Sequence, residues 1–179
     1  MNYHIIRTDD MLNGDGLRVV VFVSGCTKKC EGCHNPETWD FQSGKEFTLD
    51  NLTEVEKELD KDYISGITLS GGDPLEYNNL PDTYDIVYNV KKKYPNKTIW
   101  LYTGLELGYE NGRGDFADVD VGWDNGLLRN HILRMCDVVC DGKFIKSKAD
   151  INCPWVGSTN QRVIDVKKTI EKGEIVLYE

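Results

Sequence analysis

The chain has 179 residues, a formal net charge of −9 and 40% hydrophobic residues. This composition is typical of one globular domain spanning residues 1–179, and it excludes general disorder. The excess of 30 acidic over 21 basic residues speaks against nucleic-acid binding through bulk positive charge. The longest apolar run, residues 19–23, is far shorter than the roughly 20 residues of a membrane helix. Asp9 and Asp10 interrupt the region where a signal peptide has its apolar core, so we expect a cytoplasmic protein without a membrane.

The first predicted element is a strand over residues 19–24, whose continuous apolar side chains indicate burial on both faces. Apolar residues at helical spacing then predict a helix over residues 49–60, and a second strand follows over residues 64–70. The same pattern predicts a helix over residues 82–94, a strand over 98–103, a helix around Ile132 and a strand over 137–141. The glycine-rich and acidic region 106–126 is expected to be a long exposed loop.

This alternation of strands and helices predicts an α/β fold built from right-handed βαβ units around a mainly parallel sheet. The chain is too short for a complete eight-fold barrel of about 250 residues, so we expect a partial (βα) barrel or an open sheet. Near the C-terminus, residues 162–166 and 174–178 are expected to form a short β-hairpin with its turn at Lys172 and Gly173.

Three of the six cysteines, Cys26, Cys30 and Cys33, lie within eight residues directly after the first predicted strand. Cysteines bunched in this way in a chain without an export signal are typical of metal binding rather than of disulfides. Three thiolates can hold a 4Fe-4S cluster and leave its fourth iron open for a substrate. A zinc site with His34 or a distant cysteine as the fourth ligand is the alternative. We expect Lys28 and Lys29 to lower the pKa values of the thiols.

Polar groups follow the other predicted parallel strands at the same end of the sheet, where following loops converge on a site. They are residues 70–74 (Ser-Gly-Gly-Asp-Pro), residues 102–104 (Tyr-Thr-Gly) and residues 141–143 (Asp-Gly-Lys). The glycines at 71 and 72 allow the backbone to approach a ligand closely.

The combination of Cys-x3-Cys-x2-Cys after one strand and Gly-Gly-Asp-Pro after the next resembles the radical S-adenosylmethionine superfamily. Residues 13–18, 33–39, 69–75, 100–104, 141–144 and 157–162 together resemble one branch, the activating enzymes of anaerobic (class III) ribonucleotide reductases. This resemblance covers about residues 3–167.

The resemblance implies that Cys26, Cys30 and Cys33 hold a 4Fe-4S cluster and act as its catalytic ligands. It further implies that S-adenosylmethionine is cleaved reductively and that a glycyl radical forms on the large subunit of the reductase. An electron donor such as a flavodoxin is then a second partner. The implied contacts to S-adenosylmethionine come from the following residues: Gly32, Cys33, His34, Gly71, Gly72, Asp73, Thr103, Asp141 and Lys143.

The sequence departs from the superfamily at two of these positions. Gly32 stands where many members have an aromatic residue, so His34 is expected to stack on the adenine instead, and Asp73 replaces a glutamate. For Asp141 and Lys143, an ion pair that holds the loop is an equal alternative to a ligand contact. Residues 160–162 are candidates for docking the reductase, or simply lead into a strand.

The three downstream cysteines, Cys136, Cys140 and Cys153, are expected to pack as small hydrophobic residues, with a second metal site as the alternative. Two other functions also remain open. One is the activation of a different glycyl-radical enzyme of the pyruvate formate-lyase type, and the other is a zinc-stabilised adaptor without catalysis.

Overall fold

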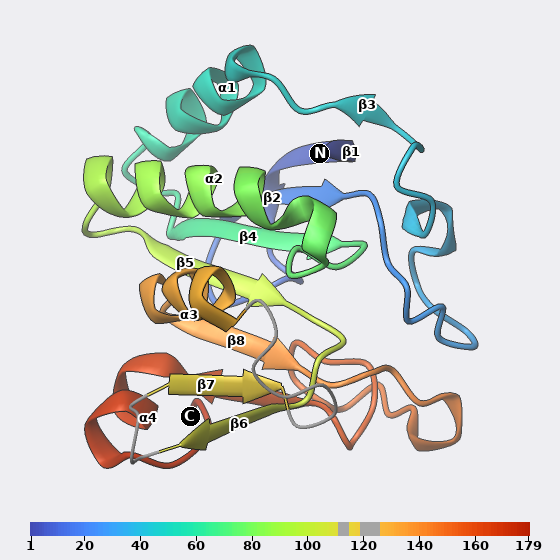
Figure 1. The fold of residues 1–179 in the computed structure, drawn as a ribbon. Coiled ribbons are helices and arrows are strands. Elements are labelled where there is room, and N and C mark those ends of the chain that lie inside the picture. The colour runs from blue at the N-terminus through green and yellow to red at the C-terminus, as the bar shows by residue number, and fades with distance from the viewer. Residues whose placement is uncertain (111–114, 119–125) are drawn as a thin grey trace.

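A computed structural model describes residues 1–110, 115–118 and 126–179 of the chain. Within these ranges the core of the fold is a sheet with the strand order β3-β1-β2-β4-β5-β8-β9 (Figure 1). Its four central strands are parallel: β2 (Arg18–Val23), β4 (Gly66–Gly71), β5 (Thr98–Tyr102) and β8 (Val138–Asp141). The predicted mainly parallel central sheet is therefore confirmed.

The register of the central strands explains why their sequences are so apolar. Val21 pairs with Leu69, Leu69 with Leu101 and Leu101 with Val139, and all four side chains are buried. A parallel strand covered on both faces has no polar side, so it appears in sequence as a continuous apolar run.

Both edges of the sheet are antiparallel. The long strand β1 (Asn2–Asp10) pairs with β2 and, on its other side, with the short β3 (Lys45–Glu46). At the opposite edge β9 (Arg162–Asp165) pairs with β8. Because the strand order begins at β3 and ends at β9, the sheet is open, and the alternative of a partial barrel is not confirmed.

Three helices cover one face of this sheet: α1 (Leu49–Leu59), α2 (Leu80–Lys93) and α3 (Gly126–Met135) (Figure 1). They bury Leu59, Val87 and Ile132, among others, in the main hydrophobic core. The other face carries a smaller cluster around Trp100, which the C-terminal part of the chain covers with Trp155 and Tyr178. Among the helices of the described residues, none has the length and apolar character needed to cross a bilayer.

The C-terminal β-hairpin predicted over residues 162–178 is only partly present, because a helix lies between its two segments. The chain leaves β9 into α4 (Val166–Lys172), which Asp165 caps and which ends at Gly173 with a φ of 73°. The segment after α4 then returns to β9, where Ile164 and Leu177 form a single bridge. The two segments thus lie side by side as expected, but a helix connects them instead of a turn.

The prediction of an exposed loop over residues 106–126 is wrong for the part of this range that the structure describes. Strands β6 (Leu107–Glu110) and β7 (Asp115–Asp118) form a separate antiparallel pair. Leu107 and Phe116 are buried, and the side chain of Asn130 on α3 bonds both the amide and the carbonyl group of Phe116. The remainder of the predicted loop, residues 111–114 and 119–125, lies outside the described residues.

Candidate functional site

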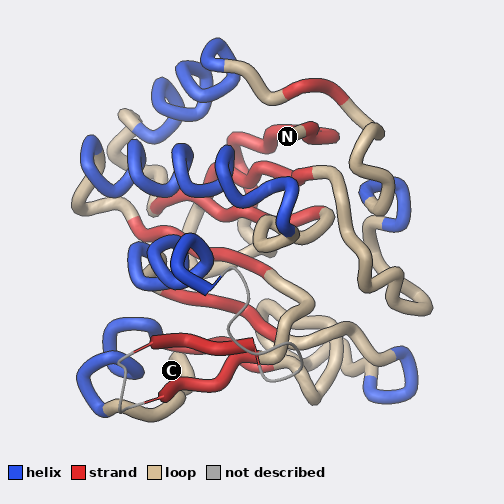
Figure 2. The backbone as a smooth tube through the Cα atoms, in the orientation of Figure 1, coloured by secondary structure: helices blue, strands red, loops and turns tan. Residues whose placement is uncertain are grey.

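The carboxyl ends of the four central strands open into one cavity of about 530 Å³. Figure 2 shows the loops that follow these strands gathered on one side of the molecule. The predicted site residues that line the cavity are Cys26, Cys30, Cys33, His34, Gly71, Gly72, Thr103 and Lys143. Three predicted residues, Gly32, Asp73 and Asp141, are not among its lining residues.

The start of the cysteine loop is hydrogen-bonded to the segment that follows the loop. The N–H groups of Gly25 and Cys26 donate to the carbonyl oxygens of Thr38 and Trp39, at 2.7 and 3.1 Å. Within the loop, the N–H of Cys33 donates to the carbonyl oxygen of Cys30. All three cysteines are free thiols of intermediate burial, so the loop presents them to the cavity without a disulfide.

The environment of Cys26 differs from the expected one. Burial raises the pKa of its thiol to about 11, and the negative charge of Asp73 raises it further. The backbone groups of Lys28 and Lys29 oppose this shift. The two lysines therefore act on the pKa of Cys26 in the expected direction, through their backbone groups, but burial and Asp73 outweigh them. Coordination to a metal would deprotonate this thiol, because thiol ligands bind metals as thiolates.

The donor set fits a 4Fe-4S cluster with three protein ligands. Among the described residues, no group of three or more His, Cys, Asp and Glu side chains is placed to hold one metal ion. A zinc ion needs its ligands to converge, with each sulfur at about 2.3 Å from the metal. A 4Fe-4S cluster binds each thiolate through a different iron, so three thiols that line one cavity are suited to it.

The Gly-Gly-Asp turn packs directly against the start of the cysteine loop. The N–H of Gly72 donates to Val23 and the N–H of Asp73 donates to Gly25, at 2.7 and 2.8 Å. A Cβ atom at Gly72 would lie only 2.6 Å from the carbonyl oxygen of Gly25. Gly71 has a φ of +99°, a conformation that favours glycine. Gly72 is therefore required by the close approach of the two loops, and Gly71 by its backbone conformation and its contact with β2.

Asp73 connects this turn to the end of β5. Its buried carboxylate accepts hydrogen bonds from the hydroxyl of Thr103 at 3.0 Å, and from the N–H groups of Gly104 and Leu75 at 2.9 Å. Burial raises the pKa of this carboxyl group, and the three donors oppose that shift. In this arrangement Asp73 fixes the shape of the cavity wall from behind.

Asp141 is also occupied by protein groups. Its fully buried carboxylate forms an ion pair with Arg162 and accepts the N–H of Leu107 at 2.8 Å. Asp141 therefore forms an ion pair, as one of the two interpretations expected, but its partner is Arg162 and not Lys143. Residues 160–162 were interpreted either as a docking site or as the lead into a strand. Arg162 does lie on β9, whereas the neighbouring Gln161 lines the cavity.

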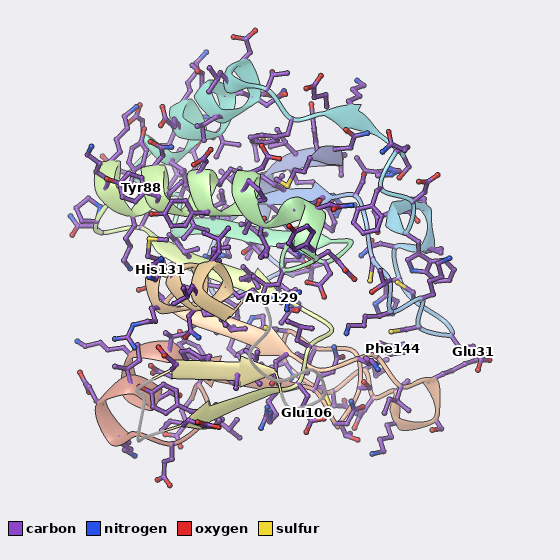
Figure 3. All side chains as sticks on the ribbon, in the orientation of Figure 1. Glu31, Tyr88, Glu106, Arg129, His131 and Phe144 are labelled. Carbon is purple, nitrogen blue, oxygen red and sulfur yellow. The ribbon has the colours of Figure 1, made fainter. Side chains whose placement is uncertain are left out.

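Aromatic rings form the far wall of the cavity. The rings of His34 and Phe144 pack at a centroid distance of 5.5 Å, and Phe144 is labelled in Figure 3 at this end of the molecule. Trp155 also lines the cavity, with a φ of 61° that is unusual for a residue other than glycine. Its carbonyl oxygen accepts a hydrogen bond from the hydroxyl of Tyr102. Burial raises the pKa of that hydroxyl, so Tyr102 stays neutral and remains a donor.

Sequence reasoning missed several of the lining residues, among them Arg7, Cys153 and Trp155. Arg7 and Trp155 carry no local motif, since one lies on the unpredicted strand β1 and the other in an irregular loop. Cys153 was expected to pack, but it lines the cavity with the three motif cysteines. By contrast, Cys136 and Cys140 are buried in the two hydrophobic clusters, so packing is confirmed for them. Burial raises the pKa of the Cys140 thiol to about 12.

Comparison with known proteins agrees with this site. A family model described as a 4Fe-4S single cluster domain matches residues 12–164. A protein of enterobacteria phage T4 is 40% identical over 163 residues, which cover 91% of this chain and 93% of that protein. An Escherichia coli K12 protein is 36% identical over 165 residues, covering 91% and 97%, and a Vibrio cholerae protein is 39% identical over 163 residues, covering 90% and 96%.

All three relatives are named anaerobic ribonucleoside-triphosphate reductase-activating proteins. The open α/β fold and the cysteine-lined cavity, together with the domain match, define a protein of the 4Fe-4S single-cluster class. The chain belongs to the family of anaerobic ribonucleoside-triphosphate reductase-activating proteins.

Proposed function

We propose that this protein activates an anaerobic ribonucleotide reductase by forming a glycyl radical on it, with S-adenosylmethionine as the radical source. The observation that carries this proposal is the shared cavity, in which three free thiols face the Gly71–Gly72 turn. The names of the relatives supply the partner. An electron donor such as a flavodoxin completes the set of partners that we expect.

Cys26, Cys30 and Cys33 would hold the cluster. When bound, a 4Fe-4S cluster would supply the electron that splits S-adenosylmethionine into methionine and a 5′-deoxyadenosyl radical, and that radical would take a hydrogen atom from a glycine of the reductase. The chemistry belongs to the cofactors, and the protein supplies placement, charge and a dry site.

The lining residues of the chain have distinct roles in this proposal. Gly71 and Gly72 bring the backbone to the ligand because they lack side chains, and Asp73 holds Thr103 and Gly104 in position through its hydrogen bonds. Lys28 and Lys143 also line the cavity, and their charges suit the carboxylate of the methionine moiety. The rings of Phe144 and Trp155 reduce the access of water.

Reconstitution under anaerobic conditions tests the proposal. The protein is loaded with iron and sulfide, reduced with dithionite and given S-adenosylmethionine, and 5′-deoxyadenosine is measured. We expect product from the native chain and none from Cys30→Ala, whereas Cys153→Ala, which removes a thiol outside the motif, retains both its iron and the product. The reductase is then added, and a glycyl radical is sought by electron paramagnetic resonance.

The outcomes separate the alternatives. Bound zinc in place of iron and no 5′-deoxyadenosine would contradict the proposal and favour the adaptor. A radical formed on a pyruvate formate-lyase type enzyme, but not on the reductase, would favour activation of a different glycyl-radical enzyme.

A further inference from the structure

A second large cavity lies outside the site. It is a groove of about 880 Å³ that shares no lining residue with the cysteine cavity. Its wall comes from the start of β1, the segment after the cysteine loop, the segment before α2 and the start of α3. The lining residues are Met1, Asn2, Phe41, Gln42, Tyr77, Asn78, Asn79, Leu80, Pro81, Leu127 and Leu128.

The groove has a distinctive chemistry. Its described lining contains no Asp, Glu, Lys, Arg or His, although 28% of the chain is charged, and the amino group of Met1 is paired with Asp82. Four of the lining side chains are carboxamides. The amide of Asn79 is buried and donates within the protein, whereas a carboxamide such as Asn2, Gln42 or Asn78 carries both donors and an acceptor, as a peptide group does. The groove is therefore suited to an uncharged peptide segment and not to an ion or a nucleotide.

Two large side chains at the groove are left in solvent. Tyr77 is 64% exposed and Leu127 is 79% exposed. Exposed apolar residues that gather beside a groove are typical of protein interaction sites, and tyrosine is enriched among the residues that dominate binding energy.

Residues of the groove contact the same segments that form the cysteine cavity. The side-chain amide of Asn79, which lines the groove, donates to the carbonyl oxygens of Ser24 and Asp73, at 2.9 and 3.0 Å. Phe41, also in the groove, lies where a Cβ on Gly25 would meet its ring. Arg129 of α3, labelled in Figure 3, donates to the carbonyl oxygen of Leu75 and fixes α3 to the segment that follows the Gly-Gly-Asp turn.

The proposed reaction explains why such a surface is needed. Its target is a glycine, which has no side chain by which an enzyme could select it. Specificity must then come from contacts with the reductase away from the reacting carbon, and such remote contacts position the reacting group. A groove that suits peptide groups, and whose lining residues contact the loops of the cavity, meets this requirement.

We propose that the groove binds an uncharged, extended segment of the reductase that flanks the target glycine, and that Tyr77 and Leu127 are its principal contacts. This inference rests on the proposed function, because that function identifies the reductase as the partner. The segment would hold the reductase on the groove while the glycine enters the cysteine cavity.

The test compares groove variants with matched controls. Tyr77→Ser and Leu127→Ser are made in the full chain, together with Tyr63→Ser and Leu49→Ser, whose side chains are 64% and 81% exposed and lie outside the groove lining. Because all four side chains are exposed, each variant is expected to fold. The dissociation constant for the whole reductase is measured without oxygen, and 5′-deoxyadenosine formation is measured without the reductase.

We expect each groove variant to weaken reductase binding by about tenfold or more, while its 5′-deoxyadenosine formation stays at the level of the controls. Groove variants that bind the reductase as tightly as the controls, or a native chain that does not bind it, would overturn the inference. If the native chain binds the reductase but forms no 5′-deoxyadenosine, the proposed radical chemistry fails, and the binding comparison still decides the role of the groove.

Photo-crosslinking identifies the occupant directly. Benzoylphenylalanine replaces Tyr77 in one preparation and Tyr63 in another, and the crosslinked peptides are identified by mass spectrometry. Crosslinks from position 77 to a reductase segment beside the radical-bearing glycine support the proposal. Crosslinks to a second copy of this chain, or to a reductase surface far from that glycine, would overturn it.

Discussion

At the scale of single residues, the side chains that shape the site are held by hydrogen bonds more than by ion pairs. Asp10 is the clearest case, because its Oδ1 atom accepts the N–H groups of Leu12 and Asn13, both at 2.8 Å, and the side-chain amide of Asn13 at 3.0 Å. Arg7 lies 3.5 Å from its other carboxylate oxygen. Three of these neighbours, Arg7, Leu12 and Asn13, line the cysteine cavity, so Asp10 fixes one part of its rim.

This arrangement predicts a dependence of stability on pH. Burial alone raises the pKa of Asp10, but the hydrogen bonds from Asn13 and Leu12 and the charge of Arg7 outweigh it and leave the pKa below its ordinary value of 3.8. A carboxyl group whose pKa is lower in the folded state stabilises the fold above its unfolded pKa, and this contribution is lost as the pH falls through the folded pKa. Asp10→Asn keeps an acceptor at Oδ1 but removes the charge.

We expect Asp10→Asn to lower the free energy of unfolding by about 1 kcal/mol at pH 7, and the difference to close as the pH falls below 3.8. Asp10→Ala removes the acceptor as well, so its deficit is larger and part of it persists in acid. Urea unfolding of the three proteins at a series of pH values measures both effects. A difference between wild type and Asp10→Asn that does not change with pH would contradict the assigned role of the charge.

At the scale of elements, the site depends on how closely two loops approach. Gly72 and Gly104 both line the cavity, but their surroundings differ. A Cβ at Gly72 would meet the backbone of Gly25 at 2.6 Å, whereas a Cβ at Gly104 would meet Cγ of the flexible Lys28 side chain at 2.8 Å. Only the first contact cannot be relieved by a change of rotamer.

Gly72→Ala is therefore expected to separate the Gly-Gly-Asp turn from the cysteine loop, and Gly104→Ala is expected to be tolerated. The separation should cost about 1–3 kcal/mol of stability, and it should reduce both the iron bound after reconstitution and the affinity for S-adenosylmethionine. Iron and sulfide analysis and equilibrium dialysis with labelled S-adenosylmethionine measure these losses. Equal behaviour of the two variants would show that the close approach of the loops is not needed.

The elements that the sequence predicted well are those with one dominant periodicity. The central strands are buried on both faces and the helices carry apolar residues at helical spacing, so local patterns were sufficient. β1 mixes charged and apolar residues, because it is an antiparallel strand with alternating exposure. Strands β6 and β7 bury Leu107 and Phe116. The sequence around these two residues is acidic, so its apolar pattern was too weak to predict either strand.

The site shows the same division between local and long-range information. The cysteine loop and the Gly71–Gly72 turn could be predicted because they follow parallel strands, whose carboxyl ends meet at one edge of the sheet. The actual partners of Asp73 and Asp141 could not, because Thr103 and Arg162 reach them only through the pairing of other strands. Cys153 reaches the cavity through an irregular loop that has no sequence pattern.

At the scale of the whole molecule, the amino ends of the parallel strands are closed by stabilising contacts, and their carboxyl ends carry the cavities. The amino ends are closed by the buried Arg18, whose guanidinium donates to Thr68, Ile67 and Thr98 on β4 and β5. Burial lowers the pKa of Arg18 to about 10, so the group remains charged at neutral pH. The carboxyl ends carry both the cysteine cavity and the groove. Stability is thus concentrated at one end of the sheet and binding at the other, as in other parallel α/β proteins.

This division predicts what removal of the metal does to the fold. The cysteine loop is joined to the protein at Thr38 and Trp39, and also at Glu76, whose carboxylate accepts the N–H of Thr27 at 2.7 Å. A cluster bound by the three thiols holds this folded arrangement, and a ligand that binds only the folded state raises its stability. The sheet itself has its own core at a distance from the loop, so we expect the cluster-free protein to remain folded.

Loading with iron and sulfide should raise the melting temperature by about 5–15 °C, which corresponds to about 3–4 kcal/mol for a chain of this size. Anaerobic calorimetry of the loaded and chelator-treated protein measures the difference, and Cys30→Ala, which removes one ligand, should show little or none of it. The helix and strand content of the chelated protein, followed by circular dichroism, should stay that of the loaded protein. A chelated protein that unfolds at room temperature would show that the cluster builds the fold, because the sheet would then depend on the loop it carries.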